Sequence, residues 1–268
     1  MIGWTVFSDL HGTLLDRETQ DSGPALPALK ALRRSGTPLV LVSSKSLPDM
    51  LAVRRRLGHR GAFIFENGGG VALRAGSPAG RPAGFKAEGR LWIRMFGPSR
   101  ENLLGAIESL RRRTGARIAE VGRMPLKELA ARTGFSLERA ERCRQRRCSA
   151  PFFLDSPRDL PAVRRTAGEM GFKVAHGGRF YHLLGSADKG TAAKAVLGLL
   201  GGARSAALGD AQTDIPLLRA VDRPYLVQQA PGVWEPIRVK GLRRVPAPGP
   251  QGFRLAVEDL LEGSDSYR

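Results

Sequence analysis

The sequence predicts an α/β protein in which a parallel sheet, covered by helices on both faces, is interrupted by an inserted α+β domain. Two observations lead to this prediction. Short, continuous apolar runs alternate with amphipathic helical patterns near both ends of the chain, which is typical of parallel strands buried on both faces. The alternation stops near residue 86 and resumes near residue 187. We therefore expect residues 1–85 and 187–268 to form the main domain, and residues 86–186 to form the inserted one.

The first part of the main domain is expected to alternate strands with helices. The strands are short apolar runs at residues 4–7, 38–42 and 62–65. The helices, residues 26–35 and 47–57, carry apolar side chains on one face, and each is followed by a glycine that can end it. Strand, helix and strand in this order indicate parallel strands joined by crossover helices.

The inserted domain is expected to mix helices with antiparallel strands. Its predicted helices cover residues 99–113, 127–132, 137–147 and 159–170, and its predicted strands cover residues 91–95, 151–154, 172–175 and 180–184. The last two strands flank Gly177 and Gly178, so we expect them to form a hairpin. The main-domain pattern then returns, with helices at residues 192–200, 215–220 and 253–261 and strands at residues 205–208 and 224–227.

The chain is strongly basic, with a net charge of +18 at pH 7 and a pI of about 11.2. A basic surface attracts nucleic acid or anionic small molecules. We favour an anionic small-molecule substrate and expect no nucleic-acid partner, because the basic residues are scattered and form no tail or known nucleic-acid-binding motif.

The two cysteines, Cys143 and Cys148, lack the spacing of a metal site and are expected to be free thiols. Free thiols suit a reducing compartment. No apolar run approaches the ~18 residues that a membrane span needs. We therefore expect a cytoplasmic protein with no membrane partner. The sequence does not predict an oligomeric state.

Polar side chains suited to phosphoryl transfer follow several of the predicted strands. Asp9, Ser43 and Asn67 come just after the first three strands, and Asp210 follows a later one, with Asp214 four residues on. The carboxyl ends of parallel strands are where such folds bind ligands. Carboxylates gathered there repel one another, and a hard cation such as Mg²⁺ removes that repulsion. The sequence therefore predicts a Mg²⁺ site at this edge of the sheet.

Donors for a phosphate lie at the same edge. Ser43 can donate to a phosphate oxygen, and Lys189, at a helix start, adds positive charge beside free backbone N–H groups. Each feature alone has an ordinary explanation, since an Asp beside a Gly usually belongs to a turn and a Ser before a helix usually caps it. Together and in this order they favour phosphoryl transfer with Asp9 as the nucleophile.

Four segments, in order, resemble the motifs of the haloacid dehalogenase superfamily. Residues 9–14, DLHGTL, resemble its first motif, DxDGT; Ser43 fits the second and Lys189 the third. Residues 209–214, GDAQTD, resemble the fourth, GDxxND. The resemblance implies a Rossmann-like parallel-sheet core, an inserted α/β cap of the kind found in sugar phosphatases, and Mg²⁺ as the cofactor.

The resemblance also implies a role for each matching residue. Asp9 would form an aspartyl phosphate and, with the main-chain carbonyl of His11 and the carboxylate of Asp210, would hold Mg²⁺. Asp214 would support these metal ligands. Ser43, Ser44 and Lys189 would bind the phosphate oxygens of an anionic small-molecule phosphoester.

Shorter segments resemble the mannosyl-3-phosphoglycerate phosphatase family. Residues 42–46 (VSSKS), 66–69 (ENGG), 133–136 (TGFS) and 178–182 (GRFYH) resemble that family's TSKT, ENGG, TGLS and GRFYH. The resemblance implies hydrolysis of 2-O-mannosyl-3-phosphoglycerate to phosphate and mannosylglycerate, a compatible solute. Arg146 and Arg179 are candidates for binding the glycerate carboxylate, because arginine can grip it bidentately. Asn67 and His182 are candidates for positioning the substrate, with a structural hydrogen bond as an equal alternative.

Some positions depart from these families. His11 stands where the superfamily has a second aspartate that protonates the leaving oxygen and later deprotonates water. Cys148 and Ala150 depart within the cap segment, and Thr213 replaces the Asn of the fourth motif. An imidazole can transfer protons near neutral pH. Three functions therefore stay open: an active phosphatase of this type, a phosphatase of another sugar or polyol phosphate, and a catalytically impaired protein that binds phosphoesters.

Overall fold

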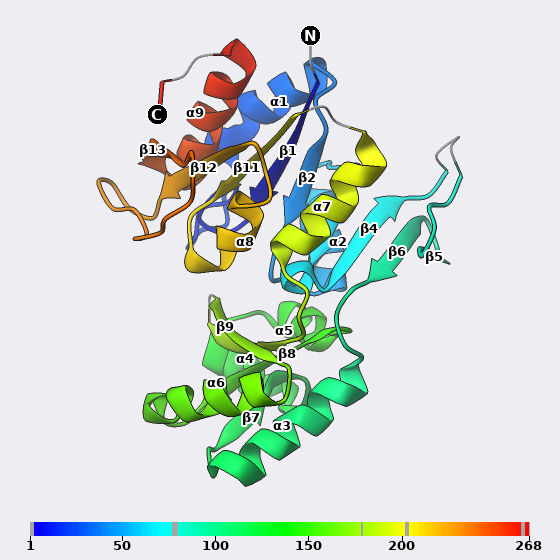
Figure 1. Ribbon diagram of the computed structural model, residues 1–268, viewed down its shortest axis with the longest axis vertical. Coiled ribbons are helices and arrows are strands. Elements are labelled where there is room, and N and C mark those ends of the chain that lie inside the picture. Colours follow the sequence, from blue (N-terminus) through cyan, green and yellow to red (C-terminus); the bar gives the residue numbers. More distant parts are fainter. Residues whose placement is uncertain (1–2, 77–79, 178, 202–203, 264–265, 268) are drawn as a thin grey trace.

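The structure, a computed structural model, describes residues 3–76, 80–177, 179–201, 204–263 and 266–267. It has a larger unit built on one mixed sheet and a smaller unit, the cap, built on a second sheet (Figure 1). The first and last described elements both belong to the larger unit, which we call the core. The predicted combination of a sheet-and-helix core with an inserted α+β unit is confirmed.

The core sheet has the strand order β13-β12-β11-β1-β2-β3-β4-β6-β5 within the described residues. Its strands are β1 (Trp4–Asp9), β2 (Leu39–Val42), β3 (Phe63–Phe65), β4 (Gly70–Arg74), β5 (Lys86–Glu88), β6 (Leu91–Met95), β11 (Arg204–Gly209), β12 (Arg223–Gln228) and β13 (Arg243–Pro248). The strands from β13 to β3 are parallel, and β4, β6 and β5 continue the sheet antiparallel. The parallel part brings the carboxyl ends of β1, β2 and β11 to one edge.

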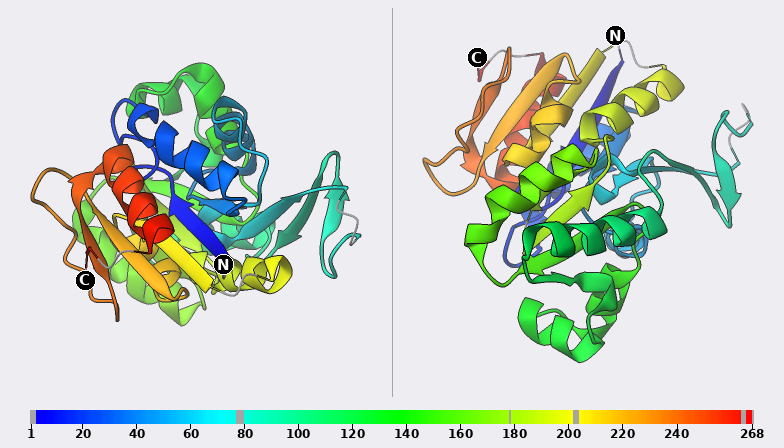
Figure 2. Two further views of the ribbon diagram at one scale, coloured as in Figure 1. Left: turned by 90° about the horizontal axis from the view of Figure 1, so that it is seen from above. Right: turned by 60° about the horizontal axis from the view of Figure 1, so that its bottom comes forward.

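Helices cover both faces of the core sheet (Figure 2). On one face lie α1 (Leu26–Arg34), α2 (Leu47–Arg56) and α9 (Gly249–Glu262), and on the other α7 (Lys189–Leu200) and α8 (Ile215–Leu218). Neighbouring residues of β1 show the division, because Val6 packs into the first apolar cluster and Phe7 into the second. Burial of both faces explains why the parallel strands read as continuous apolar runs.

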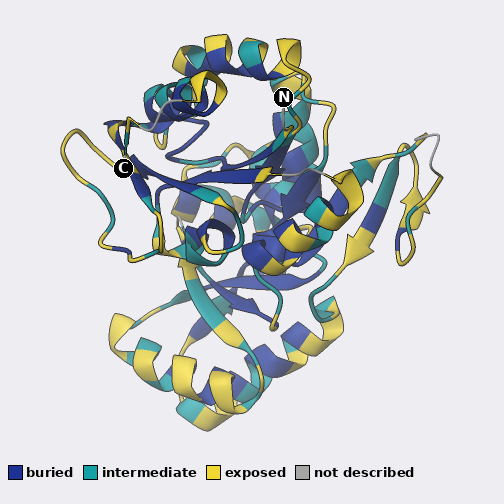
Figure 3. Ribbon diagram, turned by 45° about the horizontal axis from the view of Figure 1, so that its top comes forward, coloured by how far each residue is buried: buried dark blue, intermediate teal, exposed yellow. Residues whose placement is uncertain are grey.

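The cap sheet has the order β7-β8-β10-β9 within the described residues. Its elements are α3 (Arg100–Thr114), β7 (Ile118–Glu120), α4 (Leu126–Thr133), α5 (Leu137–Arg144), β8 (Ser149–Leu154), α6 (Leu160–Glu169), β9 (Lys173–Gly177) and β10 (Phe180–Leu184). The predicted hairpin is confirmed, since β9 and β10 pair antiparallel; Gly178 lies outside the described residues. Figure 3 shows that the outward faces of the cap helices are exposed and their inward faces buried.

The boundary expected at residue 86 differs from the boundary between the two sheets. β5 and β6 pair with each other and with β4, so residues 86–95 extend the core sheet. Ile93 is buried in the core, and Trp92 packs against its second apolar cluster. The apolar pattern of a strand does not reveal which of two sheets that strand joins. β4, β5, β7 and β13 were not predicted; β13 contains two prolines, which edge strands tolerate.

The chain enters and leaves the cap through two touching segments. A Cβ added to Gly185 would stand 2.4 Å from the Cδ of Pro98, and one added to Gly97 would stand 2.8 Å from the Cβ of Cys148. A side chain at Gly185 would therefore push the two segments apart, and one at Gly97 would push its segment away from Cys148. These segments, residues 96–99 and 185–188, are called the cap connections below.

Helix α5 of the cap packs against α2 of the core. The Nε of Arg142 donates to Asp49 Oδ1 at 3.0 Å, and the hydroxyl of Ser46 donates to the carbonyl of Arg142 at 2.6 Å. The same Ser46 caps α2 by accepting a hydrogen bond from the N–H of Asp49. The cap therefore contacts the core directly beside the segment that follows β2.

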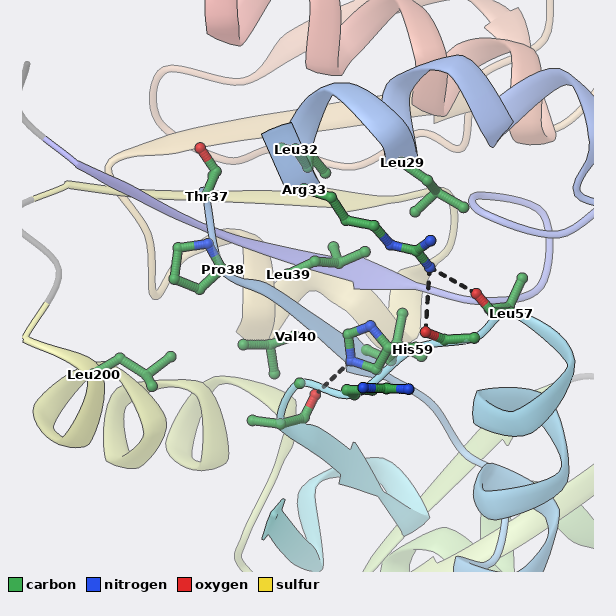
Figure 4. Close-up of a pocket in the computed structure, with 15 residues that line it drawn as sticks. Leu29, Leu32, Arg33, Thr37, Pro38, Leu39, Val40, Leu57, His59 and Leu200 are labelled. Carbon is green, nitrogen blue, oxygen red and sulfur yellow. Dashed lines mark hydrogen bonds between the residues drawn. The ribbon is translucent and has the colours of Figure 1, made fainter. Parts of the chain in front are cut away.

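A cavity of about 560 Å³ lies at the opposite, amino-terminal end of the core sheet. Residues 37–41 and 57–62 line much of it, together with parts of α1 and Leu200 (Figure 4). Arg33 donates to the carbonyls of Leu57 and Gly58 at its edge, and the His59 ring lies 3.2 Å from the carbonyl oxygen of Ala62. Because it lies at the wrong end of the strands, this cavity is separate from the predicted site.

Candidate active site

The end of β1 meets the start of α7 in a buried charge cluster. The Nζ of Lys189 lies 2.7 Å from Asp9 Oδ1 and 2.6 Å from Asp214 Oδ1, and all three side chains are buried. Burial alone would lower the pKa of Lys189, but Asp214 and Asp9 raise it above its ordinary value. Lys189 is therefore a fixed cation that holds Asp9 and Asp214 in place.

The loop after β11 brings Asp210 into the same cluster. The backbone N–H groups of Asp210 and Ala211 donate to Asp214 Oδ2 at 3.0 and 3.1 Å, so both oxygens of Asp214 have protein partners. Asp210 itself accepts a hydrogen bond from the hydroxyl of Thr13 at 3.3 Å and pairs with Arg17. Asp214 thus orients the loop, whereas the Asp210 carboxylate faces the turn that follows β1.

Gly12 permits this close approach. Its φ is +81°, and a Cβ at this position would lie 2.5 Å from Asp210 Oδ2. Any other residue would both strain the backbone and displace the carboxylate. The glycine of the first motif is therefore required by the packing of two loops.

The carboxylates of Asp9, Asp210 and Asp214 fit a divalent cation. Each offers an oxygen within 4.8 Å of the others, and all three residues are buried. Burial raises the pKa of Asp9 and of Asp210, and the charge of Asp214 raises both further. Lys189 and Arg17 only partly oppose these shifts. A hard cation with oxygen ligands would remove the remaining repulsion, as Mg²⁺ does in such sites.

The predicted phosphate-binding serines follow β2, beside Asp9. Ser43 is buried: its backbone N–H donates to the carbonyl of Ile64 at 3.0 Å, and its hydroxyl accepts the N–H of Lys45 at 3.3 Å. The N–H of Asn67 donates to the carbonyl of Ser43 at 3.0 Å, which joins the loops after β2 and β3. These contacts fix the backbone of Ser43 and Ser44, whose role toward phosphate stays a prediction.

Comparison with known proteins identifies the family. A family model described as haloacid dehalogenase-like hydrolase matches residues 6–77. A glucosyl-3-phosphoglycerate/mannosyl-3-phosphoglycerate phosphatase from Persephonella marina is 31% identical over 269 residues, which covers 96% of this chain and 96% of that protein. The chain belongs to the haloacid dehalogenase superfamily of phosphatases.

Two further proteins extend the comparison. A phosphatase of the same name from Methanococcoides burtonii is 29% identical over 262 residues, with 96% of each chain covered. A haloacid dehalogenase-like hydrolase from B. subtilis shares the fold with a TM-score of 0.66, at 17% identity over 96% of this chain and 99% of that one. The protein is thus a phosphoric monoester hydrolase of the haloacid dehalogenase superfamily. Within the described residues, no helix is both long and apolar enough to cross a bilayer.

In this haloacid dehalogenase phosphatase the residue His11 is only partly buried, although the Nε2 atom of its imidazole is covered. Its Nε2 has no hydrogen-bond partner among the described residues. Burial lowers the pKa of His11 well below its ordinary value, and the cations Lys45 and Arg139 lower it further. The imidazole is therefore neutral near pH 7, so it can accept a proton but carries no extra one to donate.

The cap arginines of the phosphatase differ in their surroundings. Arg146 is 8% exposed, and its three nitrogens are used within the protein: Nε donates to Cys143 O at 3.0 Å, Nη1 to Ser44 O at 2.6 Å, and Nη2 approaches the Cys143 sulfur. Arg179 is exposed, and its guanidinium lies 5.6 Å from the ring centre of Phe135. Arg146 thus ties the cap to the loop after β2, and Arg179 stays a candidate at the rim.

His182 and Asn67 were expected to position the substrate. His182 is buried in β10, its Nε2 lies 3.4 Å from the carbonyl of Gly177, and burial, then Arg146, lowers its pKa to about 3. Asn67 is 6% exposed and has a φ of +58°, which asparagine tolerates better than most residues. The roles of both residues toward substrate stay predictions.

Sequence reasoning missed Lys45, Glu66 and Arg139. Glu66 is fully buried, and its carboxylate accepts hydrogen bonds from the cap backbone at Arg147 and Cys148 and from the Ser149 hydroxyl. Lys45 and Glu66 lie within segments that resemble the phosphatase family, and this was the available signal. Arg139 gave no signal, because its position depends on how α5 docks on the core.

The cap departures affect packing. Ala150 is fully buried in the apolar cluster of the cap sheet, among Phe152, Val163 and Leu183. Cys148 is also buried, and its sulfur would lie 2.4 Å from a Cβ added to Gly69. Burial is the first cause that raises the pKa of the Cys148 thiol far above its ordinary value. Both departures thus lie in packed surroundings, and their effect on the choice of substrate stays a prediction.

Proposed function

We propose that this phosphatase is Mg²⁺-dependent and hydrolyses 2-O-mannosyl-3-phosphoglycerate, or its glucosyl counterpart, to phosphate and the glycosylglycerate. The observation that carries the proposal is identity of 31% along 96% of both chains to a phosphatase named for these two substrates. The buried cluster of Asp9, Lys189, Asp210 and Asp214 supports the chemistry.

In this proposal Asp9 attacks the phosphorus, and the bond between phosphorus and the glycosylglycerate oxygen breaks. The enzyme then carries an aspartyl phosphate on Asp9. Water then attacks the phosphorus, breaks its bond to Asp9 and releases inorganic phosphate. Lys189 orients Asp9 for attack through its 2.7 Å contact. The hydroxyl of Ser43 and the N–H groups around Ser44 would donate to the phosphoryl oxygens.

Asp9, Asp210 and the main-chain carbonyl of His11 would hold Mg²⁺, with Asp214 fixing the loop that carries Asp210. When bound, the cation supplies positive charge against the phosphoryl oxygens. The neutral His11 imidazole would take a proton from the attacking water. It has no proton to spare for the leaving oxygen, which then takes its proton from solvent water to become the alcohol, and release of the alcohol is therefore the harder step.

Phosphate release from 2-O-mannosyl-3-phosphoglycerate, with and without Mg²⁺, tests the proposal. We expect Mg²⁺-dependent turnover that falls roughly 10³-fold or more in Asp9→Asn, since the nucleophile is lost. Asp155→Asn changes an exposed cap aspartate in the same way and serves as the control. Turnover that survives in Asp9→Asn would exclude the aspartyl-phosphate route.

The back-substitution His11→Asp tests the assigned role of the imidazole. We expect it to raise kcat on this alkyl phosphate by about 10²-fold, because a carboxylic acid can protonate the leaving oxygen. The gain should be much smaller on p-nitrophenyl phosphate, whose leaving group needs no proton. Equal gains on both esters would show that leaving-group protonation is not what His11 limits.

A further inference from the structure

Lys45 presents a buried cation without a direct counter-ion. The residue is 7% exposed, and its ammonium has no ion pair or hydrogen bond among the described residues. A buried charge is stable only when it is paired or satisfied by a ligand. Asp49 is the carboxylate that acts on it, from beyond ion-pair distance, and Asp49 already pairs with Arg142 at 3.0 Å.

Arg139 reaches the same place from the cap. It is half-buried on α5, and its guanidinium lies 3.9 Å from the ring centre of Phe135, which holds it flat. Helix α5 docks beside the segment that carries Lys45, because Arg142 of α5 donates to Asp49 at 3.0 Å and accepts from the Ser46 hydroxyl at 2.6 Å. Positive charge from the core and from the cap therefore converges on one side of the site.

This side differs from the one that faces the nucleophile. Lys189 contacts Asp9 at 2.7 Å and Asp214 at 2.6 Å, and Arg17 pairs with Asp210. Among the described residues Lys45 forms no ion pair with these carboxylates, although it follows the serines predicted to bind phosphate. The cations near His11 thus stand apart from those that hold the transferring phosphoryl group.

We propose that Lys45 and Arg139 form a subsite for a carboxylate on the leaving part of the substrate. The proposal rests on the proposed function and deepens it, because a phosphoglycerate ester carries one carboxylate close to its phosphate. Lys45 meets the carboxylate as a point charge, and Arg139 offers paired N–H donors. Arg146 does not serve here, since its nitrogens are used within the protein.

The subsite also links recognition to the closed arrangement of core and cap. Lys45 belongs to the core and Arg139 to the cap, so a bound carboxylate would bridge the two units. A substrate without it would leave both cations unpaired. Selectivity for the carboxylate should therefore appear mainly in KM, and it should need both residues.

Kinetics on two esters test the subsite. We compare kcat/KM for 2-O-mannosyl-3-phosphoglycerate with that for 2-O-mannosylglycerol 3-phosphate, which lacks the carboxylate. In Lys45→Met and in Arg139→Met the ratio should fall roughly 10- to 100-fold. Lys30→Met and Arg132→Met, which change exposed residues, are the controls. Equal losses on both esters, or an unchanged ratio, would overturn the proposal.

A binding measurement separates this proposal from the proposed function. Calorimetry measures the binding affinities of 2-O-mannosylglycerate, which has the carboxylate, and of 2-O-mannosylglycerol, which lacks it, without any turnover. We expect the wild type to bind 2-O-mannosylglycerate more tightly. Lys45→Met and Arg139→Met should each lose that preference. If neither ester is hydrolysed but this pattern appears, the subsite stands and the proposed function fails. If the esters are hydrolysed and the pattern is absent, the subsite fails alone. Lys45→Arg, which keeps the charge, should retain the preference, and Arg139→Met decides the matter if Lys45→Met does not fold.

Discussion

Replacement of Glu66 by glutamine should weaken the link between core and cap. The Glu66 carboxylate is fully buried at the end of β3. Its oxygens lie 3.0 Å and 3.2 Å from the N–H nitrogen of Arg147, 2.9 Å from that of Cys148 and 2.7 Å from the Ser149 hydroxyl. The site thus presents donors only, and a carboxylate is the side chain that accepts from all of them.

The expected cost follows from these contacts. In Glu66→Gln one oxygen can still accept from Cys148 and Ser149, but each bond loses its charge, which costs about 1 kcal/mol per bond. The new amide N–H₂ replaces Oε1 and faces the N–H of Arg147, which loses its 3.0 Å acceptor and keeps only the 3.2 Å contact to the other oxygen, at a cost of roughly 1 kcal/mol. The free energy of unfolding should therefore fall by about 3 kcal/mol, and Tm by roughly 6–10 °C.

Differential scanning calorimetry of wild type and variant measures this change. Glu258→Gln is the control, since it makes the same replacement on an exposed residue whose partner, Arg254, lies 3.4 Å away on the same helix. Its effect should stay within about 0.5 kcal/mol. A Tm for Glu66→Gln equal to that of the control would refute the argument that the charge at Glu66 holds the cap backbone.

Further outcomes can be checked with the same methods. Gly68→Ala should lower the unfolding free energy by roughly 1–3 kcal/mol, because Gly68 has a φ of +95° and a Cβ there would lie 2.1 Å from the carbonyl oxygen of Asp188. Gly105 lies inside α3 with open space around it, so Gly105→Ala should instead stabilise the protein slightly. A similar Tm for the two variants would contradict this expectation. Burial raises the pKa values of Asp9 and Asp210, so near neutral pH the folded state binds more protons than the unfolded state does. In metal-free protein, the free energy of unfolding should therefore fall as pH rises above the ordinary carboxyl pKa of about 4. Mg²⁺ should therefore raise Tm more at pH 8 than at pH 5, and an equal rise would contradict the assigned ligands. Burial is the chief cause that lowers the pKa of His59 to about 4. Its neutral form therefore stabilises the fold above about pH 6.5, and this contribution is lost as pH falls toward 4. His59→Gln should flatten the pH–Tm curve between pH 4 and about 6.5.

The sequence predicted the parts of the site that depend on strand ends. Asp9 and Asp210 follow buried parallel strands, and such strands deliver their ends to one edge, so their meeting with Lys189 could be expected from order alone. The alternating elements of the core were found for the same reason. Apolar periodicity reports burial, and burial is what the parallel strands have in common.

Other features depend on contacts that no local pattern encodes. Whether residues 86–95 join the core or the cap sheet is decided by pairing with β4, not by their own composition. Lys45 lacks a direct counter-ion among the described residues, and this depends on the three-dimensional arrangement around it. The departure at Ala150 likewise could not be placed from the sequence, and the structure locates its side chain in the apolar interior of the cap.

The touching cap connections have a consequence for how this architecture can be rebuilt. Pro98 and Gly185 are in contact, so the ends of the inserted segment meet at one point on the core. The cap can therefore be exchanged as a unit. If the cap is removed, a short loop can join the two cap connections, and a different domain with neighbouring termini can be inserted at the same place. Such an exchange adds little loop-closure entropy and leaves the nucleophile, which is supplied wholly by the core, untouched.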